Sequence, residues 1–347
     1  MKQFDYIIVG CGLAGIAMCD ILMERDRSFI VFENNSQKSS SVAAGMYNPV
    51  ILKRFTPVWR AAEQLETSIP RYQAAERRLQ IKIDHHFPLR RRFASVEEQN
   101  LWFTAADRPK LAPFLDLNIR QNSNKNIDAP FGFGTVKGAG RVDTAAYVQA
   151  YREELDRAGL LCHETFRYDH LLQSNHGIGY GHILAKHIVF SEGFGVRQNP
   201  FFRDLPLNGT KGEVLTVRIK GLQLETPIKS SVFIIPLGED LYRVGATYSY
   251  KDKTNEPTKE GREELLTKLS SFIKGKIEVV DHRAGVRPTV KDRRPLVGQH
   301  PRYPNMYLLN GLGSRGVMIA PYVAAQLVNF IEGKGALEPE IDLNRFL

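Results

Sequence analysis

The sequence predicts a mixed α/β fold: a unit of parallel strands and helices that carries an inserted, mainly antiparallel β-sheet unit. Three observations predict it. A β-branched strand, a glycine-rich turn and a helix follow one another at the N-terminus. A second strand that ends in glycines opens a helix near the C-terminus. Between them, two segments alternate short strand patterns with turns, which is typical of antiparallel sheets.

The first element pair surrounds a glycine motif. A strand at Phe4–Val9 is followed by Gly-Cys-Gly-Leu-Ala-Gly at 10–15 and by a helical run to Arg25. Gly10 permits the tight turn, Gly12 lets a pyrophosphate approach the backbone, and Gly15 lets helix and strand pack closely. The helix N-terminus presents free N–H groups and a partial positive charge to an anion. The motif therefore predicts a dinucleotide site.

A second strand, residues 28–32, ends at Glu33. An acid at this place holds the hydroxyls of a ribose, and it favours an unphosphorylated ribose over that of NADP. Strand, turn, helix and acid together support a dinucleotide ligand against the alternative of a purely structural turn. They leave open whether the dinucleotide is FAD or NAD.

Composition and length indicate an ordinary folded globular protein. Its 347 residues suffice for two units, and hydrophobic (43%) and charged (24%) contents are typical of folded domains. The three cysteines, Cys11, Cys19 and Cys162, have neither metal nor disulfide spacing, which fits a reducing cytoplasm. The apolar run at 7–18 resembles a signal-peptide core, but Asp5 and the ordered glycines argue against one. We expect a cytoplasmic protein without membrane contact.

The formal net charge of +9 is spread over local clusters at residues 90–92, 251–253 and 291–294. A solvated basic surface explains them, and an anionic substrate or an RNA partner is the alternative. His85 and His86 are adjacent, but no further ligand falls at metal spacing, so no metal site is expected.

The next elements follow in order. Small residues at 39–49 let the backbone approach a flat ligand, above all at Gly45. A helix is predicted over 59–83, with Pro70 expected to interrupt it, and short strand-like pieces over 84–135. Asp143 and Thr144 cap a helix at 145–157. Strands follow at 160–162 and 183–191, and Gly193 marks the ligand-binding edge after the second.

The remaining segments complete both units. Strands are predicted at 212–217, 232–237, 241–248 and 277–282, with a helix at 258–273. The strand around 306–310 ends in Gly311, Gly313 and Gly316, and a helix follows over about 319–332. We therefore assign residues 1–83, 138–208 and 283–347 to the nucleotide-binding unit, and residues 84–137 and 209–282 to the substrate-binding unit.

These motifs together resemble the D-amino-acid oxidase superfamily of FAD-dependent oxidoreductases, which includes glycine oxidase and sarcosine oxidase. The resemblance rests on the N-terminal glycine motif with Glu33, on Ala-Ala-Gly-Met at 43–46, on Gly-Arg-Val-Asp at 140–143, and on Gly-Val-Arg-Pro at 285–288. Gly-Ala-Thr at 245–247 and Gly-Ser-Arg-Gly at 313–316 are similar to the oxidoreductase domain of the bifunctional tRNA 5-methylaminomethyl-2-thiouridine enzyme.

The resemblance implies a Rossmann-like FAD-binding domain with an inserted substrate domain. It also implies a set of FAD-binding residues, with the backbone of one of them, Phe166, next to the adenine. These residues are Gly10, Gly12, Leu13, Ala14, Gly15, Glu33, Ala44, Gly45, Met46, Phe166, Gly193, Gly311, Gly313, Ser314, Arg315 and Gly316.

For the substrate, the resemblance implies a carboxylate bound by the guanidinium of Arg287. Tyr248 and Arg315 are further substrate-binding candidates, and Lys53 or Arg54 would supply positive charge near the flavin. The reaction would be hydride transfer from the carbon next to a neutral amine to flavin N5, after which water hydrolyses the imine. Oxygen or another acceptor would reoxidise the flavin.

Three classes of function stay open at this point. The first is an amine or amino-acid oxidase or dehydrogenase, and the second is a tRNA-modifying oxidoreductase that removes a carboxymethyl group from carboxymethylaminomethyl-uridine. The third is a non-catalytic flavin-binding module. Because the C-terminal half contains no cysteine, non-covalent FAD is expected, with a histidine link as the alternative. The sequence gives no expectation for the oligomeric state.

Overall fold

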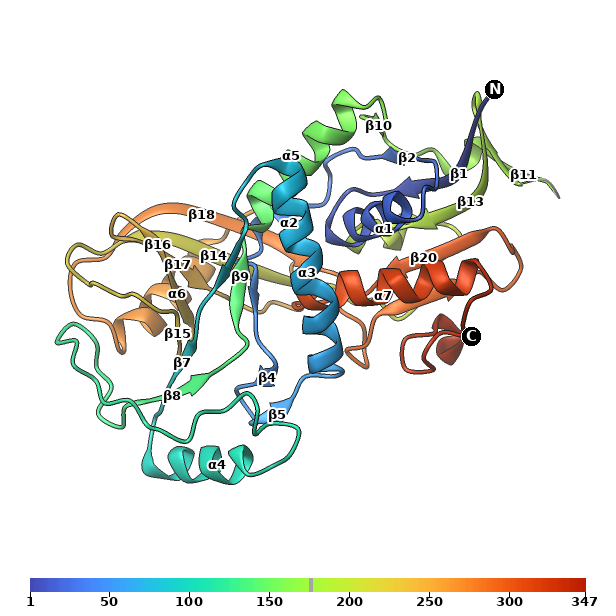
Figure 1. Cartoon of the computed structure of the whole chain (residues 1–347). Helices are drawn as coiled ribbons and strands as arrows, with labels where there is room; N and C mark the ends of the chain where they lie inside the picture. The colour runs from blue at the N-terminus through green and yellow to red at the C-terminus, as the bar shows by residue number, and fades with distance from the viewer. Residues whose placement is uncertain (175–176) are drawn as a thin grey trace.

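The structure, a computed structural model, describes residues 1–174 and 177–347. It contains two large sheets, and Figure 1 shows their strands gathered at opposite ends of the molecule, with helix α3 (Ala61–Leu79) between them in this view. The mixed α/β class with an antiparallel second sheet is as predicted.

The first sheet is built around β1 (Lys2–Val9), whose parallel neighbours are β2 (Phe29–Phe32) and β13 (Ile183–Phe190). Two more strands extend it in parallel, and three are antiparallel additions. The parallel ones are β10 (Leu161–Cys162) and β20 (Met306–Asn310), and the antiparallel ones are β11 (Leu171–Ser174), β12 (Gly177–Tyr180) and β19 (Leu296–Gln299).

Helices cover one face of this sheet. One large apolar cluster joins Ile8 and Val31 of the sheet to four helices, because each helix turns its apolar side inward. The helices are α1 (Leu13–Glu24), α3, α5 (Thr144–Arg157) and α7 (Gly316–Ile331). The opposite face packs through Ile7, Val9 and Phe32 against aromatic residues such as Phe166.

The second sheet is antiparallel except for one parallel pair, β15 with β7. Its order is β18 (Glu278–Arg287), β14 (Thr210–Arg218), β17 (Leu241–Gly245), β16 (Phe233–Gly238), β15 (Ile228–Lys229), β7 (Leu89–Arg92) and β8 (Phe133–Val136). Helix α6 (Lys259–Ser270) packs on one face through Leu265 and Leu269. The other face is free to line a cavity.

Short elements lie between and after the strands of the two sheets. They are α2 (Ser39–Val42), β3 (Met46–Tyr47), β4 (Val50–Ile51), β5 (Thr56–Pro57), β6 (Asp84–His86), α4 (Val96–Ala106), β9 (Gly140–Val142), η1 (Tyr168–His170), η2 (Gly193–Gln198) and η3 (Leu343–Phe346).

Three sequence-based expectations were wrong in detail. Helix α3 runs without interruption through Pro70. Pro70 has no N–H to donate to the carbonyl of Glu66, but both residues are on the exposed side of the helix, so the break is avoided. The segment 84–135 contains a helix, α4, which Ser95 caps by accepting a hydrogen bond from the Glu98 N–H at 3.3 Å. The strand expected at 277–282 continues to Arg287, so β18 crosses the boundary that we placed at residue 283.

Within the described ranges, no helix has the length and apolarity needed to cross a membrane. The same ranges contain no group of three or more His, Cys, Asp or Glu side chains placed to hold a metal ion.

Candidate active site

A cavity of about 830 Å³ extends from the β1–α1 turn to the antiparallel sheet. It is lined by Gly10 and Glu33 at one end and by Tyr248 and Arg287 at the other. The volume lies in the range of cofactor sites, and both sheets contribute lining residues.

The turn after β1 has the geometry that the glycine motif predicts. Gly10 has a φ of +100°, and a Cβ there would lie 2.5 Å from the carbonyl oxygen of Ser191. A Cβ on Gly15 would lie 1.9 Å from the Gly10 carbonyl oxygen, so the close packing of helix and strand requires this glycine. Helix α1 begins after Gly12, and the Leu13 N–H donates to the hydroxyl of Ser40 at 3.1 Å. Backbone donors and a hydroxyl thus meet where a phosphate would bind.

The Glu33 carboxylate is held at the end of β2 by three groups. Its Oε2 accepts from the Cys11 N–H at 2.6 Å and pairs with Arg152 at 2.9 Å, and its Oε1 accepts from the Asn35 N–H at 2.6 Å. Arg152 also donates to the Cys11 carbonyl. These contacts therefore fix the orientation of the carboxylate at the cavity wall.

A flat, doubly anchored cofactor fits the middle of the cavity. At Gly45 the φ is +73°, and a Cβ would lie 1.8 Å from the Val142 carbonyl oxygen, so only glycine fits. Ala43, Ala44 and Met46 line the same wall. The buried Ser191 hydroxyl, beside the β1–α1 turn, has no hydrogen-bond partner within the described ranges. Together with the N-terminus of α7 at Gly316, these features suit a dinucleotide that carries rings at both ends.

At the opposite end Arg287 presents a guanidinium removed from water. Its Nη1 donates to the Thr247 carbonyl at 3.3 Å, and its Cζ lies 4.6 Å from the ring centroid of Tyr248. The group lies directly over Gly212, where a Cβ would be 1.9 Å from Nη2. Burial lowers the pKa of Arg287, which still leaves it cationic. None of the ion pairs between described residues involves Arg287.

Arg315 is the second cation at this end. Burial lowers the pKa of Arg315, and the Tyr248 phenol opposes this shift at both arginines, so the tyrosine lies near each of them. Arg315 also has no carboxylate partner among the described ion pairs. A buried guanidinium without an acid is costly, and it binds a carboxylate strongly and in a fixed orientation.

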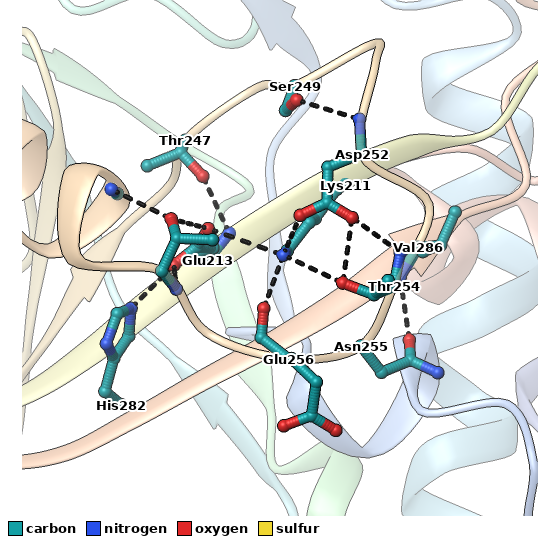
Figure 2. Close-up of polar contacts among 12 residues, drawn as sticks. Lys211, Glu213, Thr247, Ser249, Asp252, Thr254, Asn255, Glu256, His282 and Val286 are labelled. Atoms are coloured by element: carbon teal, nitrogen blue, oxygen red, sulfur yellow. Dashed lines mark hydrogen bonds and ion pairs between the residues drawn. The ribbon is translucent and has the colours of Figure 1, made fainter.

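A polar cluster around Lys211 and Glu213 of β14 anchors the loop of residues 246–258 (Figure 2). The fully buried Lys211 of β14 donates to the Asp252 carboxylate, to the Glu256 carbonyl and, at 3.3 Å, to the Thr254 hydroxyl. The backbone of Lys211 also pairs in both directions with Ser249, at 2.9 and 3.0 Å. One lysine thus fixes the loop that carries Thr247 and Tyr248.

The second half of the cluster centres on Glu213, which is also buried. Its carboxylate lies 2.8 Å from His282 and accepts from the Thr258 N–H and hydroxyl at 2.9 and 2.7 Å. The Glu213 N–H donates to the Thr247 hydroxyl at 2.9 Å. The carbonyl that orients Arg287 is therefore held by β14, β18 and the start of α6 (Figure 2).

Most sequence-predicted site residues line this one cavity. They are Gly10, Gly12, Leu13, Ala14, Glu33, Ala44, Gly45, Met46, Lys53, Phe166, Gly193, Tyr248, Arg287, Gly313, Ser314, Arg315 and Gly316. Three do not line it: Gly15 and Gly311 are backbone-packing positions, and Arg54 is an exposed residue next to Lys53.

Sequence reasoning missed many residues of the cavity lining, among them Ser40, Arg152, Glu192 and Lys229. Arg152 lies one turn after Val148, on the apolar side of α5. An arginine is unusual on the apolar side of a helix, so this position could have been recognised from the sequence as a candidate site residue. Glu192 is held by the Tyr168 hydroxyl and by Asn199, and burial raises its pKa to about 7.

A family model described as FAD-dependent oxidoreductase matches residues 5–329. The chain belongs to this family. It is therefore an FAD-dependent enzyme. Family membership selects FAD over NAD and excludes the non-catalytic alternative. Among curated relatives, glycine oxidase of Bacillus licheniformis is 24% identical over 96% of this chain and 94% of that protein.

A second group of relatives is longer. The tRNA 5-methylaminomethyl-2-thiouridine biosynthesis bifunctional protein MnmC of Shewanella amazonensis is 24% identical over 96% of this chain, which spans 57% of that protein. Both resemblances stated from the motifs are confirmed by these matches.

Solved structures show the same fold. Glycine oxidase from Geobacillus kaustophilus superposes with a TM-score of 0.81 over all of both chains at 20% identity. Iminodiacetate oxidase from Chelativorans sp. BNC1 gives 0.78 over 96% of this chain and 97% of that chain at 16% identity. The L-α-glycerophosphate oxidase of Mycoplasma pneumoniae, solved with FAD bound, gives 0.77 over 99% of both chains at 15% identity.

Proposed function

We propose that this FAD-dependent oxidoreductase oxidises the C–N bond of an amino acid or a secondary amine that carries a carboxylate. The observation that carries the proposal is the buried, acid-free guanidinium of Arg287 in the same cavity as the FAD-binding turns. A carboxylate is the group that best satisfies such a guanidinium, because both can form two parallel hydrogen bonds.

The residues of the chain divide the work of the reaction. Arg287 binds the substrate carboxylate, and Tyr248 and Arg315 close the same end of the cavity. When bound, FAD supplies the acceptor for the hydride that leaves the carbon next to the neutral amine. The substrate becomes an imine, which water hydrolyses to a carbonyl compound and an amine. Positioning carries most of the acceleration, since the site needs no general acid–base pair.

The cofactor is proposed to be bound without a covalent link. Cys11 and Cys19 are buried, and burial raises the pKa of each thiol well above its usual range, so neither is a reactive thiolate. FAD would then be bound by Gly10, Gly12 and Glu33 at one end and by residues 313–316 at the other. Oxygen is proposed as the acceptor that completes the cycle, with another electron acceptor as the alternative.

A second candidate is the oxidation of a carboxymethylaminomethyl group on tRNA. Such a group is an N-substituted glycine, so the same Arg287 would bind it. The similarity to the MnmC proteins favours this candidate, and the net charge of +9 agrees with an RNA partner.

The test is an anaerobic titration of the purified, FAD-loaded protein, followed by the absorbance of the flavin. Glycine, sarcosine and D-amino acids are added first, and tRNA that carries the carboxymethylaminomethyl group is added afterwards. Bleaching by a small amine is the expected result. Bleaching by the tRNA alone selects the second candidate, and a protein that binds no FAD contradicts both.

A further inference from the structure

Lys229 is a cation inside the cavity that the proposed reaction does not use. It lies on the two-residue strand β15 and lines the cavity together with Phe233 and Leu89. No described ion pair involves it, and Arg91 contacts only its carbonyl oxygen. Burial and the nearby charges of Arg91 and Lys268 lower its pKa to about 8, so it is largely protonated at neutral pH.

Register places Lys229 on the same sheet face as the Arg287 site. Lys229 is directly opposite Phe233, Phe233 is opposite Gly245, and Gly245 is opposite Val214. Residues opposite one another in neighbouring strands point to the same face. Gly212, which lies under the Arg287 guanidinium, is two residues before Val214 and therefore shares this face.

The same register gives the separation of the two cations. From β14 to β15 there are three strand spacings of about 4.8 Å, and from Val214 to Gly212 two residues of about 3.4 Å each. The two backbone positions are therefore about 16 Å apart. The two charged groups are then on the order of 10 to 16 Å apart, the lower value applying when the Lys229 side chain extends along the sheet toward Arg287. The carboxylate and amine of glycine span far less.

The charges around Lys229 favour an anion. Lys53 lines the same cavity, and Glu264, one of the acids in the lining, is already paired with Lys268 at 2.5 Å. A second negative group in the cavity would thus pair with the Lys229 ammonium, which has no acidic partner among the described residues. Because this ammonium is shielded from bulk water, the charge pair is stronger than one at the surface.

We propose that Lys229 forms a second subsite, which binds a distal anionic group of the substrate. The substrate would be a small N-substituted amino acid whose first carboxylate is bound by Arg287 and whose second anionic group lies on the order of 10 Å away. The proposal rests on the proposed function and narrows its substrate class. A small molecule fits better than an RNA backbone, because Lys229 lies inside the cavity and not on the exposed surface.

The test uses a dianion that cannot be oxidised. Binding of azelate, a linear dicarboxylate of suitable length, and of nonanoate, the monocarboxylate of the same chain length, is measured by calorimetry on the FAD-loaded protein. The variants are Lys229→Met and Lys229→Arg, with Lys110→Met as an exposed control. The natural protein is expected to prefer azelate about tenfold. Lys229→Met removes this preference, Lys229→Arg retains it, and Lys110→Met leaves it unchanged.

Two results overturn the proposal: equal binding of azelate and nonanoate by the natural protein, or a preference that survives Lys229→Met. Binding of an RNA stem-loop that depends on Lys229, without an azelate preference, also overturns it in favour of a nucleic-acid ligand. Failure of the proposed function is seen separately. If no amine bleaches the flavin but the azelate preference depends on Lys229, the subsite stands and the proposed oxidation does not.

Discussion

At the scale of single residues, Arg287 carries the substrate assignment. Replacing it with methionine removes the charge that holds the carboxylate, and kcat/KM for the reactive amine should fall at least a hundredfold, equivalent to about 3 kcal/mol. Arg287→Lys keeps the charge without the bidentate geometry and should recover part of the loss. Steady-state kinetics on carboxylated and decarboxylated amines make the comparison. A uniform loss on both substrates would argue against a carboxylate-binding role.

Most residues that type and spacing assigned to the cofactor half line the cavity, because that half follows from short local motifs. Gly10 and Gly45 have a positive φ, and the glycine that such a turn requires is visible in a short window of sequence. The substrate half depends on convergence instead. Tyr248 is far in sequence from both Arg287 and Arg315, and only the fold brings it near each of them, so this arrangement could not be derived from spacing.

At the scale of elements, the loop of residues 246–258 depends on Lys211. Asp252→Asn weakens its contact with that lysine, whose influence holds the pKa of Asp252 at about 2. The loop should become more mobile while the sheet stays intact. We expect KM for the amine to rise three- to tenfold with kcat within about twofold, since Tyr248 and Thr247 position Arg287 and do not react.

Hydrogen exchange gives a second measurement that does not need turnover. Amides in residues 246–258 should exchange faster in Asp252→Asn, while those of β1 and β13 keep their protection. Asp107→Asn, at the exposed end of α4, is the matched control. If amide exchange in the loop is unchanged while KM rises, the effect comes from the lost charge of Asp252 and not from a loss of loop anchoring.

The elements that the sequence missed have identifiable causes. Helix α4 has a weak apolar pattern, but the Ser95 and Glu98 cap was a local signal that could have revealed it. Pro70 looked like a break because a proline removes a backbone donor, yet on the solvent side the free carbonyl can bond to water. The length of β18 could not be predicted, because its last residues are paired with Thr210 and Lys211, far away in sequence.

At the scale of the whole molecule, Glu192 links stability to pH. Its pKa in the folded state is about 7, above the ordinary value for glutamate, so the folded protein binds the proton more tightly than the unfolded one. The contribution of Glu192 to the free energy of unfolding is therefore fully present below about pH 4.5, and it is lost as the pH rises through 7. The full loss is on the order of 3 kcal/mol.

Glu192→Gln removes this dependence, because the amide stays neutral. In chemical denaturation, the free energy of unfolding of the variant relative to the natural protein should be higher at pH 8 than at pH 5. Equal differences at the two pH values would show that the carboxyl ionises normally in the folded protein. Asp5 and Glu332, whose pKa values are about 2, act in the opposite direction and only below about pH 4.

Strand β18 has a consequence for how substrate reaches the site. It is paired with β14 along nearly its whole length, and the same continuous strand leads into the segment before the second cofactor turn. A hinge needs a short flexible linker, and β18 provides a rigid rod instead. Substrate and product should therefore enter and leave the cavity while the two sheets stay fixed, and side-chain movement alone would gate the passage.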